Sequence, residues 1–193
     1  YVPINNLMVG FGLTKKNLTW DINAKYAILK QMISGGSPVS LSYFVNAAID
    51  SRDKNAFTNA DELVFSDRLS YFHQLLLARK ISDKLSLQIA GSLSHFNTIY
   101  PAPGLEDGSV QQLDNDHFAL AISAKYMVTN TMNILVNYDH PLTTRPSIDP
   151  EFPDSKDPKP NFSFGVEFNT SAHQFQIFLG NYNSIIPQTN NTY

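Results

Sequence analysis

Apolar and polar residues alternate along most of this 193-residue chain. In residues 85–94, for example, Leu85 and Leu87 alternate with Ser86 and Gln88. Because successive side chains of a β-strand point to opposite faces, a period of two predicts strands with one apolar face. Nine such segments are predicted, at residues 7–13, 19–29, 39–50, 69–81, 85–94, 118–126, 132–139, 162–168 and 174–180. We therefore expect an all-β chain that forms a single domain over residues 1–193.

The length of these segments and the composition of their polar face favour a membrane barrel over a soluble sandwich. Strands of soluble proteins average about 5–6 residues, whereas about 9–11 residues cross a bilayer at a tilt. The polar face consists mainly of Ser, Ala, Gly, Asn and Gln, and only 16% of all residues are charged. Small uncharged side chains suit the crowded interior of a barrel. We expect an antiparallel, up-and-down transmembrane β-barrel with its apolar stripe facing lipid.

Aromatic residues lie toward the ends of the apolar faces, where lipid headgroups begin. The aromatic girdle predicted from this pattern comprises Trp20, Tyr71, Tyr126, Tyr138 and Phe168. Between these ends, the same alternation predicts a lipid-facing belt that includes Leu87, Ile89, Leu120, Ile122, Ile134 and Phe164. Ser92 and Ser123 have the opposite parity and should face the lumen.

The connections between the predicted strands alternate between short and long. The short ones are residues 31–37, 82–84, 128–131 and 170–172, and the long ones are 51–62, 97–116 and 140–160. Bacterial outer-membrane barrels place short turns in the periplasm and long loops outside, so the outer membrane is the expected location. The turn at residues 14–17 is the exception, because it is short and falls on the long-loop side. An odd strand number would leave the chain ends on opposite faces, so we expect at least one further strand beyond residue 193.

Three blocks of sequence carry a family resemblance. Residues 69–88 read LSYFHQLLLARKISDKLSLQ, residues 21–31 read DINAKYAILKQ, and residues 173–181 read HQFQIFLGN. These blocks resemble an uncharacterised outer-membrane β-barrel family of Bacteroidota, a domain of unknown function. The resemblance implies a signal peptide, a preceding strand pair and a closing C-terminal strand, which would bring the intact barrel to about twelve strands. It implies no particular reaction.

Composition removes several classes of function. The formal net charge is −3 and no basic run is present, which argues against nucleic acid as a partner. The absence of cysteine excludes a disulfide scaffold and a thiolate metal site. The acidic loop 97–116 contains Asp114-Asn-Asp116 but lacks the spacing of a calcium loop. No metal and no cofactor are therefore expected.

The histidines offer no convincing catalytic arrangement. His73 and His95 fall on the lipid-facing parity, near the outer interface. If residues 82–84 form the turn, Tyr71 should lie opposite His95. Ser94 has the opposite parity to its neighbour His95, and no third residue that would orient the imidazole is evident. We expect no catalytic residues.

Charged residues of the lumen face divide into two groups. The group near the short turns should gather at the periplasmic end and comprises Lys25, Lys80, Lys125 and Glu167. Since buried charges need partners, Glu167 is expected to pair with Lys125. The group near the long loops should form an acidic outer mouth and comprises Asp21, Asp50 and Asp139.

These patterns favour a non-enzymatic outer-membrane barrel. It is expected to be either a narrow or plugged, porin-like pore or a subunit of a membrane protein complex. Its expected partners are outer-membrane lipids, together with other outer-membrane proteins that bind the loops 97–116 and 140–160, of which the second is rich in proline. Two alternatives remain open: an outer-membrane lipid-modifying enzyme, and a soluble lipocalin-like barrel that encloses its apolar face.

Overall fold

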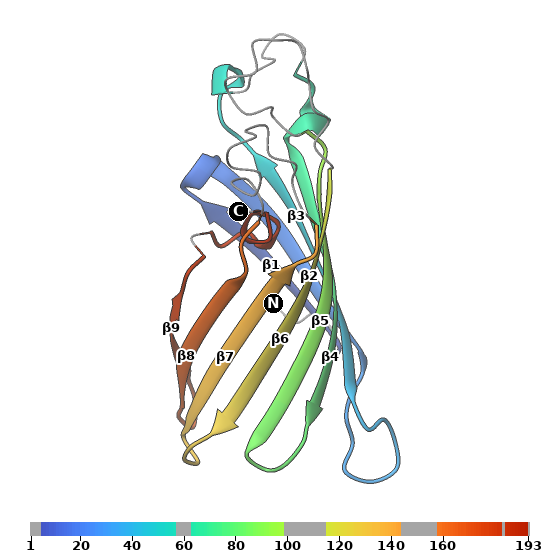
Figure 1. The fold of residues 1–193 in the computed structure, drawn as a ribbon, viewed down its shortest axis with the longest axis vertical. Helices are drawn as coiled ribbons and strands as arrows, with labels where there is room; N and C mark the ends of the chain where they lie inside the picture. The colour runs from blue at the N-terminus through green and yellow to red at the C-terminus, as the bar shows by residue number, and fades with distance from the viewer. Residues whose placement is uncertain (1–4, 57–62, 99–114, 144–157, 183, 193) are drawn as a thin grey trace, which may run out of the picture.

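The chain forms one curved antiparallel sheet in which each strand pairs with the next (Figure 1). The computed structural model describes residues 5–56, 63–98, 115–143, 158–182 and 184–192. Within them the strands are β1 (Leu7–Thr14), β2 (Thr19–Leu29), β3 (Ser40–Asp50), β4 (Leu69–Lys80), β5 (Leu85–Phe96), β6 (Asp116–Met127), β7 (Met132–Pro141), β8 (Asn161–Asn169) and β9 (Gln174–Gly180). The sheet forms half of a barrel, with β1 and β9 at its edges. The predicted all-β, up-and-down fold is confirmed.

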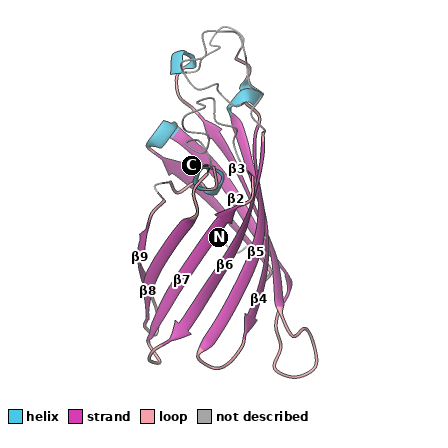
Figure 2. Cartoon of the chain, in the orientation of Figure 1, coloured by secondary structure: helices cyan, strands magenta, loops and turns pink. Residues whose placement is uncertain are grey.

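Helical structure is limited to four short turns in the described part of the chain. They are η1 (Lys16–Leu18), η2 (Lys54–Ala56), η3 (Phe65–Arg68) and α1 (Pro187–Asn190). Figure 2 shows the first three at one end of the sheet and α1 inside its curve. No helix among the described residues has the length and apolar character needed to cross a membrane.

The two faces of the sheet differ as the alternation predicts. Leu87, Ile89, Leu120, Ile122 and Phe164 are all exposed on the convex wall, and Ile134 is half-exposed. On the concave face Ser92 is 9% exposed and Ser94 is fully buried. An apolar outer wall around a polar interior is the arrangement of a membrane barrel. This exposure argues against the soluble alternative, which requires the apolar face to be enclosed.

Turn length sets the register of the hairpins. The turn between β4 and β5 is closed by a 2.8 Å hydrogen bond from the Ile81 N–H to the Leu85 carbonyl. With this closure, Tyr71 lies opposite His95, as predicted. The connections β2–β3, β4–β5, β6–β7 and β8–β9 lie at one end of the sheet, which we call the short-turn end (Figure 1). The short β1–β2 turn, which contains η1, lies at the other end, as the sequence predicts. The opposite end, where η1, η2 and η3 lie, is called the long-loop end.

Candidate functional site

The segment that follows β9 turns into the space enclosed by the sheet (Figure 1). Residues 184–192 form this lumen segment, which includes α1. Ile186, Gln188 and Thr192 are each at most 4% exposed, and Asn191 is 8% exposed. Pro187 occupies the start of α1, where its missing N–H leaves no hydrogen bond unmade. The Asn190 side chain bonds the Ser184 backbone twice, at 3.0 and 2.6 Å, which closes the segment into a compact loop.

Hydrogen bonds fix the lumen segment to both sides of the half-barrel. The Gln188 Nε2 donates to Asn46 Oδ1 on β3 and to Ser70 Oγ on β4, each at 3.1 Å. The Asn191 Nδ2 donates to Ser92 Oγ on β5 at 3.1 Å. On the other side, the Asn161 Nδ2 of β8 donates to the Asn190 carbonyl at 2.6 Å. The segment therefore bridges the lumen from β3–β5 to β8.

A polar cavity of about 370 Å³ lies against the lumen segment. It brings together Asp21 of β2 and Asp139 of β7, two of the three residues predicted for the acidic outer mouth. The described residues that line it include no Lys, Arg or His. The third predicted residue, Asp50, does not line this cavity and forms a 2.6 Å ion pair with Arg52 instead.

Amide side chains hold both cavity carboxylates in place. Asp21 Oδ2 accepts hydrogen bonds from Asn46 Nδ2 at 2.8 Å and from Asn23 Nδ2 at 3.3 Å. Asp139 Oδ2 accepts from Asn137 Nδ2 at 2.5 Å. Because Asn46 also accepts from Gln188, one amide joins the carboxylate of β2 to the lumen segment.

A glycine on β1 leaves room for the Asp21 side chain. Gly12 lies directly opposite Asp21 in the β1–β2 pair. A Cβ at Gly12 would lie 2.1 Å from Asp21 Oδ1, which is inside van der Waals contact. Any larger residue at this position would displace the carboxylate or the strand.

A second cluster of polar side chains, separate from the cavity, surrounds Glu167, whose side chain is 2% exposed. Its Oε1 is ion-paired with Lys125 of β6 and accepts hydrogen bonds from Asn133 at 2.8 Å and Asn169 at 3.0 Å. Its Oε2 accepts from Gln176 of β9 at 2.7 Å. This network joins the four strands β6–β9 and satisfies a buried carboxylate, as the low polarity of the interior requires.

The other two lysines of the predicted cluster do not take part in this network. Lys80, the last residue of β4, reaches the turn and lies 3.4 Å from Asp83, where both side chains are exposed. Lys25 is half-buried on β2 and makes no ion pair with a described residue. Sequence reasoning also missed the amides that surround Glu167, although their inward parity was a usable signal.

The predicted aromatic girdle lies on the convex wall. Trp20, Tyr71 and Tyr138 lie toward the long-loop end of β2, β4 and β7, whereas Tyr126 and Phe168 lie at the short-turn end of β6 and β8. Four of the five are exposed, from 39% for Tyr138 to 47% for Tyr126, and Tyr71 is half-exposed. They are thus placed on the wall that the alternation assigns to lipid.

The histidines of the convex wall have partners that the sequence did not reveal. His95 Nδ1 lies 2.7 Å from Asp116 Oδ1, and the Tyr43 hydroxyl lies 2.6 Å from His73 Nδ1. Asp116 was expected in the loop 97–116, but it is the first residue of β6, directly opposite His95. The expectation that His95 has no orienting partner is corrected accordingly.

Two further observations bear on catalysis and metal binding. Ser94, the neighbour of His95, is fully buried on the concave face and does not share the histidine's wall. Among the described residues, no three His, Cys, Asp or Glu side chains gather into a possible metal site. Most of the predicted docking loops, residues 99–114 and 144–157, lie outside the described residues.

A comparison with known protein families identifies the family of this chain. The model of a family described as a membrane-bound β-barrel domain (DUF5777) matches residues 1–193. No curated protein and no solved structure matches significantly. The match confirms the resemblance to a membrane β-barrel family of unknown function, and it agrees with the apolar convex wall. This chain belongs to the family of membrane-bound β-barrel domains.

Proposed function

We propose that this protein is a non-enzymatic outer-membrane barrel whose lumen is plugged at the long-loop end by its own segment, residues 184–192. One observation carries the proposal: Gln188 is fully buried inside the curve of the sheet and donates hydrogen bonds to two separate strands. A loop that merely covered the barrel mouth would keep such polar side chains in water.

The chemistry of the plug suits a closed but displaceable barrier. The described hydrogen bonds between the plug and the wall all join uncharged groups, and each is worth roughly 0.5–1.5 kcal/mol net. Water that entered with an opening movement would replace them at small net cost. The cavity beside the plug carries two carboxylates, so an opened lumen favours cations at this level.

Two features support the bacterial outer membrane as the location. All the described short turns except the one between β1 and β2 gather at one end of the sheet, the arrangement that outer-membrane barrels show on their periplasmic side. The sequence blocks at residues 21–31, 69–88 and 173–181 resemble a Bacteroidota outer-membrane family. In this orientation the plug enters from outside, and we propose the sequences of the loops 97–116 and 140–160 as the regions that bind other outer-membrane proteins.

A lipid-modifying enzyme is the second candidate, and the His95–Asp116 pair on the lipid-facing wall is the observation that favours it. The pair resembles the base and orienting acid of a triad, but Ser94 lies on the opposite face. Lipid turnover by the intact protein that is abolished by His95→Ala would support the enzyme. Lipid turnover that is unaffected by His73→Ala and His95→Ala would rule out an enzyme that uses these histidines.

The plug can be tested by cross-linking, because the chain contains no cysteine. The pair Asn46→Cys with Gln188→Cys is introduced into the intact protein in its native membrane and treated with a short bis-maleimide. We expect an internal cross-link, visible as a shift in gel mobility of the denatured protein. The matched control pairs Gln188→Cys with Ser123→Cys, whose serine bonds Asn137 elsewhere on the concave face. Equal yields in both pairs, or none in the first, would contradict the plug.

A further inference from the structure

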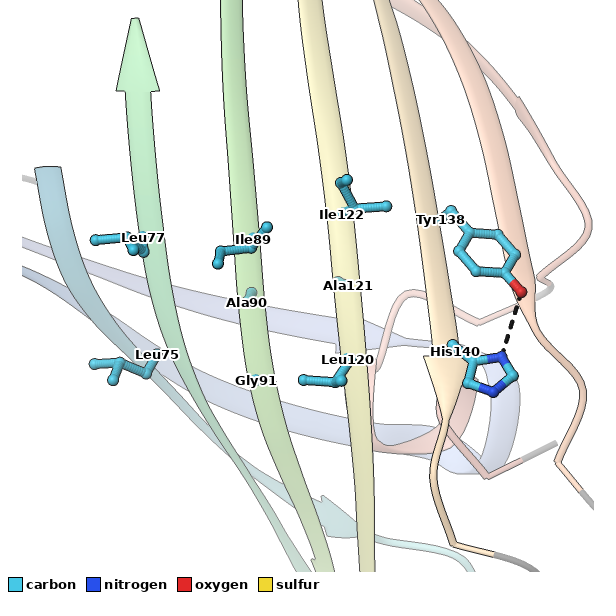
Figure 3. Close-up of a pocket in the computed structure, with 10 residues that line it drawn as sticks. All are labelled: Leu75, Leu77, Ile89, Ala90, Gly91, Leu120, Ala121, Ile122, Tyr138 and His140. Atoms are coloured by element: carbon cyan, nitrogen blue, oxygen red, sulfur yellow. Dashed lines mark hydrogen bonds between the residues drawn. The ribbon is translucent and has the colours of Figure 1, made fainter. Parts of the chain in front are cut away.

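The convex wall is hollowed across β4–β7. This outer groove has a volume of about 530 Å³, and Figure 3 shows its lining. Gly91 of β5 lies between Leu75 and Leu120 in the sheet and has no side chain to fill the space between them. A Cβ at Gly91 would meet nothing closer than the Leu120 Cδ2, at 3.9 Å. The glycine therefore forms part of the floor of the groove.

Two parallel rows of paired residues give the groove its direction. One row runs Leu75, Gly91, Leu120, His140, and the other runs Leu77, Ile89, Ile122, Tyr138. His140 is the next-to-last residue of β7, at the long-loop end, whereas Leu77 lies three residues before the short-turn end of β4. Because barrel strands are tilted, such a row crosses the wall obliquely. The groove thus begins near the outer boundary and descends into the apolar belt.

The two ends of the groove differ in polarity. At the β7 end, the Tyr138 hydroxyl lies 3.3 Å from His140 Nδ1, the contact drawn dashed in Figure 3. His140 is exposed, and its second ring nitrogen makes no hydrogen bond with a described residue. The side chains along the remaining length, on β4, β5 and β6, are all apolar. This is the polarity profile of an amphiphile with its polar group at the β7 end.

We propose that the outer groove binds one acyl chain of a membrane phospholipid, whose headgroup lies against Tyr138 and His140. The wall is already the lipid-facing surface of a membrane-bound barrel, so the proposed site is continuous with an established lipid interface. Its volume falls within the roughly 300–1,000 Å³ of small-molecule sites. A chain in the groove contacts side chains on both flanks as well as the floor, so it is held more tightly than a chain on a flat wall. The proposal is independent of the lumen plug.

The proposal is tested by filling the groove with a larger side chain and measuring how many lipid molecules remain bound. Gly91→Leu places an isobutyl group on the floor. Its matched control is Ala24→Leu, which enlarges another small outward-facing residue, between Val9 and Val45. The intact protein is delipidated in mild detergent, and phosphatidylethanolamine is titrated in while native mass spectrometry records occupancy. We expect one tightly bound lipid in the wild type and in the control, and an apparent Kd raised about tenfold or more in Gly91→Leu.

A second variant separates headgroup from chain. His140→Ala should weaken phosphatidylethanolamine binding and leave binding of a diacylglycerol, which lacks the phosphate, unchanged. Heat-dependent gel mobility of each variant shows whether its barrel has folded. Phosphatidylethanolamine binding that is unaltered in both Gly91→Leu and His140→Ala would overturn the proposal. A wild type that is a lipid-free dimer, with Gly91→Leu monomeric, would overturn it in favour of a second copy in the groove.

Discussion

Gln188 of α1 donates a 3.1 Å hydrogen bond to Asn46 of β3, although 142 residues separate them in the chain. The contact joins the segment after the ninth strand to the third strand, across the interior of the sheet. Closing so long a loop in the unfolded chain has a large entropic cost. The contact is therefore expected to form only once the intervening strands are in place. The plug is therefore expected to be a late and separable part of the fold.

Removing the Gln188 amide should loosen the plug without unfolding the wall. Gln188→Ala leaves Asn46 Oδ1 and Ser70 Oγ without these donors, a loss of about 1–3 kcal/mol from the docked state. The readout is the rate at which a water-soluble maleimide modifies Gln74→Cys, a position that lines the cavity beside the plug. We expect faster modification in Gln188→Ala and an unchanged rate in Ser123→Ala. A rate that Gln188→Ala leaves unchanged would count against docking through this side chain.

Neighbouring residues on opposite faces should respond differently to charge. Ile122→Arg places a cation on the lipid-facing wall, which costs about 2–4 kcal/mol near the bilayer midplane. Ser123→Arg places the same group on the lumen face, where Ser123 bonds Asn137 and Asn137 bonds Asp139, and should be far milder. The urea midpoint of folding in lipid vesicles measures both. Equal losses would mean that the two faces are reversed.

The Glu167 network should contribute substantially to stability. Glu167→Ala removes the acceptor of an ion pair and three amide hydrogen bonds, for an expected loss on the order of 3 kcal/mol. The Lys125 side chain is 42% exposed and is solvated in part, which keeps the loss below that of a fully buried pair. Gln176→Ala removes one donor only and should cost about 1 kcal/mol. Equal urea midpoints for these two variants would contradict a carboxylate-centred network.

Two glycines should respond differently to replacement by alanine. Gly12→Ala drives a methyl group into Asp21 and breaks its contact with Asn46, so we expect a loss of about 1–2 kcal/mol. Gly91→Ala meets no close atom and reduces the entropy of the unfolded chain, so it should be neutral or stabilising by about 0.5–1 kcal/mol. Thermal unfolding in detergent compares them, and destabilisation by both would show that steric contact with Asp21 is not the cause.

The strands and their faces could be predicted because the information is local. The alternation of Ile122 with Ser123 is enough to assign each to a wall, since the side-chain period of a strand is two. The β4–β5 register followed from the turn, which is why Tyr71 could be placed opposite His95. The Glu167–Lys125 pair followed from parity and from the requirement that a buried charge have a partner.

The plug, the Asp116 contact and the outer groove could not be predicted in this way. The lumen segment has no alternation, and Gln188 in isolation resembles any polar loop residue, so only the folded sheet reveals its burial. The Asp116–His95 contact depends on β6 starting two residues earlier than the pattern suggested. The outer groove depends on three consecutive registers, from β4 to β7, and on the missing side chain of Gly91.

Single-channel recording compares the plugged and unplugged lumen. The intact protein and the double variant Gln188→Ala/Asn191→Ala, which lacks the plug's hydrogen bonds to β3, β4 and β5, are reconstituted in planar bilayers. The plug predicts little or no steady conductance in the wild type and a larger, longer-lived, cation-favouring conductance in the variant. A wide, steady conductance of equal size in both would contradict it.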